Sequence, residues 1–163
     1  MTSSSYNKVN CPISGLLSQV GDQWTLLIVR DLLVGVERFD DIQRSLQLSR
    51  NILTQRLNRL VKEGFVEKIP VREGVSRWRY KPTEKCEQLL PILLAMSEWG
   101  ERWTANAKGK RTVAIDKRTG SPVKLELRRE SDRKQIAFEH LLFKAGPGAD
   151  AAVKRHLGEY TGR

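Results

Sequence analysis

The feature that most constrains this fold is a pair of helical patterns separated by about two residues. DDIQRSL, residues 40–46, ends just before LSRNILTQRLNRLVKEG, residues 48–64, in which Ser49 suits an N-cap. The second stretch has apolar residues at helical spacing, which predicts one apolar face: Leu53, Leu57, Leu60 and Val61. So short a turn lets the second helix cross the first, as a helix-turn-helix requires.

A hairpin pattern follows the helix pair. FVEKIPV, residues 65–71, and SRWRYKP, residues 76–82, alternate β-branched or aromatic residues with charged ones, and they are joined across Gly74. Two strands placed directly after a helix-turn-helix form a wing. The order of elements therefore predicts a mainly α fold with a small β component, a winged helix-turn-helix.

The rest of the chain supplies flanking helices and an appendage. Residues 84–103 read as one long helix that Pro91 should kink. After about residue 106 the composition changes, and residues 112–116 and 123–129 read as strands separated by a turn. We expect a flexible N-terminus at 1–9, a winged-helix domain at 10–106, a small β-rich appendage at 107–150 and a tail or short helix at 151–163.

The polar face of the second helix offers amides, hydroxyls and cations, with no acid before Glu63. The major groove of B-DNA admits one α-helix, where Arg suits guanine, Asn and Gln suit adenine, and Thr suits a thymine methyl. Any one such residue alone is more often ordinary solvated surface. Together they predict a DNA recognition helix whose contact residues are Ser49, Arg50, Asn51, Thr54, Gln55, Asn58, Arg59 and Lys62.

Charge supports a polyanionic partner. The formal net charge is +10, and residues 44–81 hold ten Lys or Arg against three acids. This favours nucleic acid ahead of an anionic membrane surface. In the hairpin Arg72, Arg77 and Arg79 are expected to contact flanking DNA, while Trp78 and Tyr80 are expected to face the core.

The long helix is apolar nearly all round, whereas one core covers only one stripe of a helix. The excess must face a second subunit or, within a monomer, the appendage. A twofold homodimer is the commonest solution, and it would set two recognition helices roughly 34 Å apart on an inverted repeat. The expected interface residues on this helix are Leu89, Leu90, Leu93, Met96, Trp99 and Trp103.

Several motifs together resemble the HxlR-type winged helix-turn-helix transcriptional regulators. They are Cys-Pro at 11–12, GDQWTLLI at 21–28, LTQRL at 53–57, RYKPTE at 79–84 and Trp-Gly at 99–100. The resemblance spans about residues 10–103. It implies a bacterial, cytoplasmic, homodimeric DNA-binding regulator, often a repressor, whose first and long C-terminal helices form the dimer, with Leu16 in the interface.

The sequence leaves open two ways in which DNA binding could be regulated. Some members of this family keep a thiol that responds to oxidants, and Cys11 stands near a helix N-terminus, which favours the thiolate form. Cys11 is thus a candidate redox sensor, or simply a small packed residue. A small ligand could instead bind an apolar cleft between the dimer helices, lined by Trp24, Met96, Trp99 and Trp103, although such aromatics are more often core.

The sequence gives little support to other functional classes, such as enzymes or membrane proteins. The only histidines, His140 and His156, lack metal-ligand spacing, and no phosphate loop or nucleophile motif is present, so we expect no enzyme, metal or cofactor. No apolar run approaches the ~20 residues of a membrane span, and the start of the chain lacks a secretory signal, which favours a cytoplasmic protein. The main alternative is a winged helix used for protein or RNA contacts without sequence-specific DNA binding.

Overall fold

The computed structural model describes residues 10–72, 77–104 and 107–160, which divide into two compact units. The winged-helix unit runs from residue 20 to residue 122, and the terminal unit combines residues 10–19 with residues 123–160. None of the described helices is both long and apolar enough to cross a membrane.

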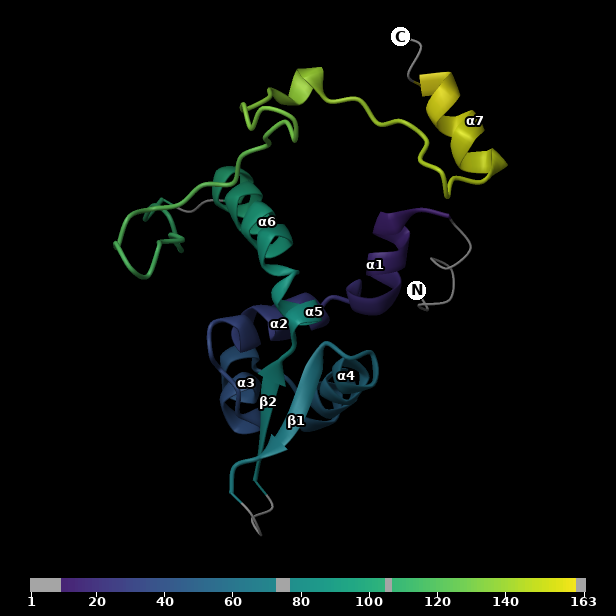
Figure 1. Cartoon of the computed structure of the whole chain (residues 1–163). Helices are drawn as coiled ribbons and strands as arrows, with labels where there is room; N and C mark the ends of the chain where they lie inside the picture. Colours follow the sequence, from purple (N-terminus) through teal and green to yellow (C-terminus); the bar gives the residue numbers. More distant parts are fainter. Residues whose placement is uncertain (1–9, 73–76, 105–106, 161–163) are drawn as a thin grey trace. The chain divides into compact units, whose positions relative to one another are not determined.

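The winged-helix unit has the predicted order of elements (Figure 1). Its helices and strands are α2 (Thr25–Leu33), α3 (Phe39–Leu46), α4 (Arg50–Lys62), β1 (Val66–Pro70), β2 (Trp78–Pro82), α5 (Glu84–Glu87) and α6 (Leu90–Trp103). β1 and β2 pair antiparallel, with Val66 opposite Pro82. An isolated antiparallel bridge between Arg38 and Arg79 joins the segment before α3 to β2. The predicted winged helix-turn-helix is therefore confirmed.

The helices of this unit share one apolar core. Leu53 and Leu57 of α4 have no exposed surface, and neither do Ile28 of α2 and Ile42 of α3. Each such side chain contributes roughly 1.5–3 kcal/mol by leaving water. The leucine stripe therefore fixes α4 against the core and turns its polar face outward.

The turn between α3 and α4 has the predicted length. Gln47 ends α3 in the left-handed conformation at φ 52°, and the Gln43 side-chain amide donates to the Leu48 carbonyl at 3.1 Å. The Ser49 hydroxyl then accepts the Ile52 N–H at 3.3 Å and caps α4, as expected. Two residues thus reverse the chain between the helices.

The long helix expected over 84–103 is interrupted rather than kinked. α5 ends at Glu87, and α6 begins at Leu90 with Pro91 in its first turn. Proline has no N–H to donate to the carbonyl four residues earlier, so a helix starts here more easily than it continues. Cys86 and Leu89 are buried at the interruption and hold it in the core.

The strands expected in the appendage are not formed in the described residues. Residues 107–150 contain only isolated bridges, Ile115 with Pro122 and Arg128 with Gln135, and the short helix η2 (Phe138–His140). The turn between the expected strands exists, because the Gly120 N–H donates to the Asp116 carbonyl at 2.7 Å. A two-stranded hairpin is only marginally stable without a surface to pack on. The described residues 107–150 therefore contain the predicted turn but not the predicted strands.

The terminal unit brings the two ends of the chain together. It contains α1 (Pro12–Val20, apart from its last residue) and α7 (Ala151–Tyr160), the expected final helix. The Asn10 side-chain amide donates to the Gly148 carbonyl at 3.2 Å. Asp150 caps α7 by accepting the Val153 N–H at 2.9 Å, which lowers the pKa of this carboxyl.

Candidate nucleic-acid interface

The outward face of α4 carries most of the predicted contact residues. Six of the eight are exposed along it: Arg50, Asn51, Thr54, Gln55, Asn58 and Lys62. Ser49 is exposed as well, but its hydroxyl is engaged as the helix cap. Arg59 is only half-exposed. The Gln55 amide donates to the Asn51 side-chain oxygen at 3.4 Å, so these two groups lie side by side on one face.

Arg50 stands where α3 and α4 meet. Its guanidinium lies 4.9 Å from the centre of the Phe39 ring and 3.7 Å from the Asp40 carboxylate. Both side chains of this ion pair are largely exposed, so the pair stabilises the fold by at most about 1 kcal/mol. Arg50 can therefore exchange Asp40 for an external acceptor at little cost.

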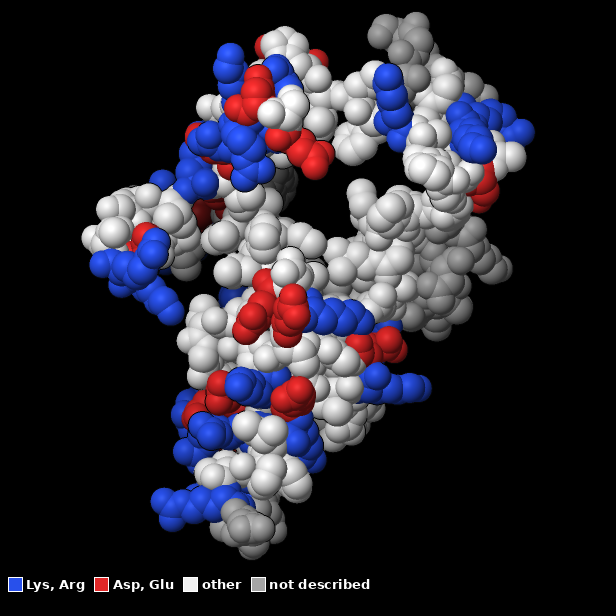
Figure 2. All heavy atoms as spheres, viewed as in Figure 1, with Lys and Arg blue, Asp and Glu red and all other residues white. Residues whose placement is uncertain are grey.

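A cleft of about 330 Å³ separates this junction from the wing. Its lining comes from the start of α3, the start of α4 and the outer end of the hairpin: Arg38, Phe39, Asp40, Arg50, Val71, Arg77, Trp78 and Tyr80. Three guanidinium groups against one carboxylate leave the cleft cationic. In Figure 2 the Lys and Arg side chains gather over the part of this unit where α3 and the wing lie, with a few acids among them. The arrangement suits a phosphate backbone lying between helix and wing.

The wing presents its predicted arginines to solvent. Arg72, Arg77 and Arg79 are all exposed, and the Val71 N–H donates to the Arg77 carbonyl at 2.9 Å, so Arg72 and Arg77 leave the same end of the hairpin. The tip, residues 73–76, lies outside the described residues. Arg79 also lies 3.7 Å from the Glu37 carboxylate, which ties β2 to the segment before α3.

The expectation that Trp78 faces the core was wrong. Trp78 is 43% exposed, whereas Tyr80 is buried, and burial raises the pKa of the Tyr80 hydroxyl. Trp78 pairs with Pro70 at the outer end of the sheet, beyond the reach of the core, and the Lys68 ammonium lies 4.9 Å from its ring. An exposed aromatic ring with a cation beside it is therefore a further candidate contact on the wing.

Sequence reasoning missed the residues that orient α4. The Asp22 carboxylate accepts the N–H groups of Trp24 and Thr25 at 3.0 and 3.1 Å and also the Thr25 hydroxyl. The Arg56 guanidinium of α4 lies 3.1 Å from the same carboxylate. One carboxylate, that of Asp22, thus caps the start of α2 and also binds the arginine that holds α4. The available signal was the position of Arg56, which stands among the leucines of the buried stripe and away from the polar face.

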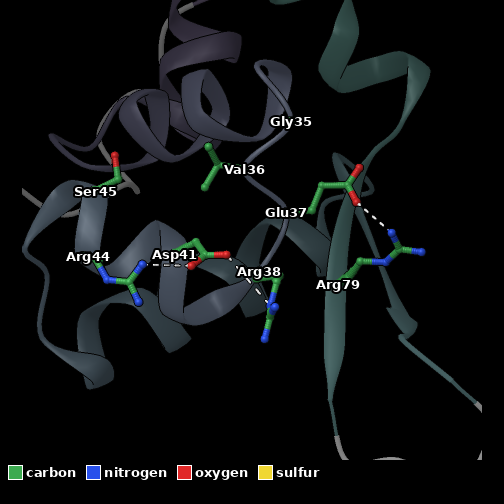
Figure 3. Close-up of a pocket in the computed structure, with 8 residues that line it drawn as sticks. All are labelled: Gly35, Val36, Glu37, Arg38, Asp41, Arg44, Ser45 and Arg79. Carbon is green, nitrogen blue, oxygen red and sulfur yellow. Dashed lines mark hydrogen bonds and ion pairs between the residues drawn. The ribbon is translucent and has the colours of Figure 1, made fainter.

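A second cleft, of about 580 Å³, lies between α3 and β2 (Figure 3). Figure 3 shows Asp41 between two arginines, 3.2 Å from Arg44 and 3.9 Å from Arg38, and Glu37 beside Arg79. Each cation lining this cleft therefore has an acidic partner. The ion pair between Arg79 and Glu37 ties β2 to the segment before α3 across this cleft.

The cysteines differ in environment. Cys11 is half-buried just before α1, whereas Cys86 is fully buried. Burial, together with the charge of Glu87, raises the pKa of the Cys86 thiol to about 11, so this thiol remains protonated and unreactive. Among the residues that the structure describes, no group of three or more His, Cys, Asp or Glu could hold a metal ion.

The expected interface residues fall into three sets. Leu90, Met96, Trp99 and Trp103 of α6 are exposed, and the two tryptophans keep 63% and 68% of their surface open. Leu16 and Leu93 are half-buried. Leu89 is 4% exposed because it lies at the interruption before α6, so it belongs to the core of its own chain rather than to an outer face.

Comparisons with known proteins find helix-turn-helix transcriptional regulators. A family model described as HxlR-like helix-turn-helix matches residues 19–108. The HTH-type transcriptional regulator Rv3095 of Mycobacterium tuberculosis is 33% identical over 57% of this chain, and the chain spans 59% of the length of that relative. YvaP of Bacillus subtilis, a regulator of the same type, is 39% identical over 50% of this chain and 76% of its own.

Solved structures extend the similarity. PA1607, a putative transcription factor, has a TM-score of 0.77 at 34% identity over 87% of this chain and 99% of its own. A putative transcription factor from Pseudomonas aeruginosa, PA1374, has a TM-score of 0.62 at 35% identity over 90% of this chain and 99% of its own. The redox regulator HypR in its reduced form has a TM-score of 0.52 at 28% identity over 56% of this chain and 92% of its own.

Proposed function

This chain belongs to the HxlR-like helix-turn-helix family, and from that premise we propose that it is a transcriptional repressor that binds an inverted-repeat DNA sequence as a homodimer. The observation that carries the proposal is the outward face of α4, which is free of acids and stands beside a cationic cleft at the outer end of the wing. A groove-reading helix needs the first feature, and a grip on the flanking backbone needs the second.

Base recognition falls to the outward face of α4. Gln55 and Asn51 offer paired amide groups, which suit the donor and acceptor edge of adenine. Arg50 exchanges its exposed partner Asp40 for guanine or for a phosphate oxygen. These contacts set the sequence preference of the protein.

Affinity comes largely from phosphate contacts. The arginines of the cleft and the wing neutralise backbone charge on either side of the groove, and Trp78 packs against the sugar edge beside them. Such contacts hold any duplex and are sensitive to salt. The wing therefore contributes to affinity without determining which DNA sequence is preferred.

Dimerisation joins two copies of this DNA-binding surface. The exposed apolar side chains of α6, with Leu16 of α1, form the proposed interface. Twofold symmetry then places the two α4 helices about one turn of DNA apart, which is why the site is an inverted repeat.

Cys11 supplies a route to regulation. The redox regulator HypR shares the fold, and Cys11 has exposed surface, while Cys86 is shielded. Oxidation of Cys11 would then alter α1 and, through it, the dimer. Peroxide treatment of the wild-type protein and of Cys11→Ser tests this: the wild type should lose DNA affinity and the variant should keep it. Equal responses of the two proteins would contradict a role for Cys11.

The experiment for the DNA-binding role starts with selection of a preferred duplex from a random library by the full-length protein. Fluorescence anisotropy then measures the affinity for the selected and a scrambled duplex over a range of salt concentrations. We expect a selected-to-scrambled ratio of about 10³ or more, with both affinities falling steeply as salt rises. A ratio near one, or stronger binding to single-stranded RNA, would favour the alternative of a winged helix used for other contacts.

A further inference from the structure

Exposed apolar side chains gather in two parts of this chain. Among the described residues, twelve of the eighteen large exposed ones lie in α6 or in residues 123–143. In α6 they are Leu90, Ile92, Met96, Trp99 and Trp103, which we call the α6 surface. In residues 123–143, which we call the arm, they are Val123, Leu125, Leu127, Phe138, Leu141, Leu142 and Phe143. Single exposed apolar residues are common, whereas gatherings of this kind mark an interface.

Residues 111–112, which follow α6 in the same unit, do not cover the α6 surface. The Glu101 carboxylate accepts the N–H groups of Arg111 and Thr112 at 3.1 and 3.2 Å, and the Arg111 guanidinium donates to the Gly100 carbonyl at 2.9 Å. These bonds hold residues 111–112 at the polar C-terminal end of the helix. The tryptophans of the α6 surface remain about two-thirds exposed beside this clamp.

The arm carries the pattern of a one-sided strand. Val123, Leu125 and Leu127 alternate with Lys124 and Glu126, so the apolar side chains share one face of an extended chain. These three side chains are 36–47% exposed. Further along the arm, Phe138 is 80% exposed. An alternating pattern forms a stable strand only when its apolar face packs on another surface.

A second copy of this chain fits both surfaces. The two tryptophans of α6 offer roughly 250 Å² of open surface, since an aromatic side chain buries about 150–250 Å². A stable interface takes about 800 Å² from each partner, more than these two side chains provide. The arm supplies seven more large apolar side chains. In a twofold dimer each copy offers one α6 surface and one arm, so both are covered at once and in equal number.

We propose that the arm of one copy packs on the α6 surface of a second copy, so that the dimer exchanges two arms. The inference rests on the homodimer of the proposed function and adds the arm to its interface. It accounts for an ordered segment that exposes apolar side chains and that lacks the strands its pattern predicts.

Photo-crosslinking tests the exchange directly. Benzoylphenylalanine replaces Phe138 in the full-length protein, and equal amounts of ¹⁴N- and ¹⁵N-labelled protein are mixed before illumination. Mass spectrometry should find crosslinked peptides of mixed isotope that join the arm to α6. Crosslinks to α6 found only within one isotope would show that the arm folds onto its own chain, and crosslinks elsewhere would show another occupant. Either result would overturn the proposal.

Matched variants give the energetic test. Val123→Gln with Leu127→Gln removes two side chains from the apolar face, and Lys124→Gln changes the residue between them on the opposite face. Sedimentation equilibrium should show a dimer dissociation constant raised about tenfold or more by the first change and unaltered by the second. Equal constants in both would overturn the exchange. Selective DNA binding by the wild type is measured separately. If the arm variants fail to weaken the dimer while the wild type still binds DNA selectively, only the arm proposal is overturned. If the wild type does not bind DNA selectively, the proposed function itself is overturned.

Discussion

The contact between Asp22 and Arg56 should be the strongest polar determinant of how α4 is held. Asp22→Ala removes the cap of α2, which costs about 0.5–2 kcal/mol. It also leaves the Arg56 guanidinium, whose side chain is 29% exposed, without its acidic partner. Exposed pairs contribute up to about 1 kcal/mol and breaking a buried one costs about 3–5, so this half-buried pair should cost about 1–2. The expected loss in the free energy of unfolding is therefore roughly 1.5–4 kcal/mol.

Urea denaturation followed by circular dichroism measures this loss, and two further variants separate its parts. Asp22→Asn keeps an oxygen for the N–H groups of α2 but loses the charge, so it should cost about half as much. A double-mutant cycle of Asp22→Asn with Arg56→Met should give a coupling of about 1 kcal/mol or more. Asp41→Asn, which alters only half-exposed ion pairs, is the control and should cost under about 1 kcal/mol. A loss below 1 kcal/mol in Asp22→Ala, or a coupling near zero, would refute the anchoring role of Asp22.

Three further predictions follow from other contacts. Gln55→Ala should reduce the discrimination between bases at one position of the site by about 1–3 kcal/mol. Arg77→Ala should instead weaken binding to all duplexes alike and lower the slope of log affinity against log salt concentration by about one. Identical sequence profiles of the two variants in a binding-site selection would contradict these separate roles. Gln47→Gly should raise the free energy of unfolding by about 0.5–1 kcal/mol, because Gln47 has φ 52°, and a loss of stability in urea would show that the turn is not strained. Hydrogen bonds from residues 111–112 lower the pKa of Glu101, so its clamp should be complete above pH 4.5 and weaken as the pH falls further; the amide resonances of these residues should move in that range, and no such movement should occur in Glu101→Gln.

The helix pair and the wing were predictable because their signals are local. The leucine spacing of α4, the two-residue turn and the alternation of the hairpin each determine structure within a few residues of themselves. The core of the winged-helix unit follows from those patterns. The same locality explains why the outward face of α4 could be named residue by residue.

The parts that were missed depend on distant partners. Arg56 meets Asp22 across thirty-four positions, and no periodicity predicts such a contact. Trp78 alternates as an inward residue should, but it lies beyond the end of the core. Residues 112–129 carry a strand pattern but form only isolated bridges. The alternation identifies which side of the segment can pack on another surface, and it does not identify that surface.

In the proposed complex, two copies of α4 lie in successive major grooves of one duplex. Dimethyl sulfate interference on the selected duplex tests this most directly, because methylation of guanine N7 blocks contacts in the major groove. We expect two clusters of interfering guanines on one face of the duplex, about ten base pairs apart and related by twofold symmetry. A single cluster, or uniform interference along the duplex, would contradict it.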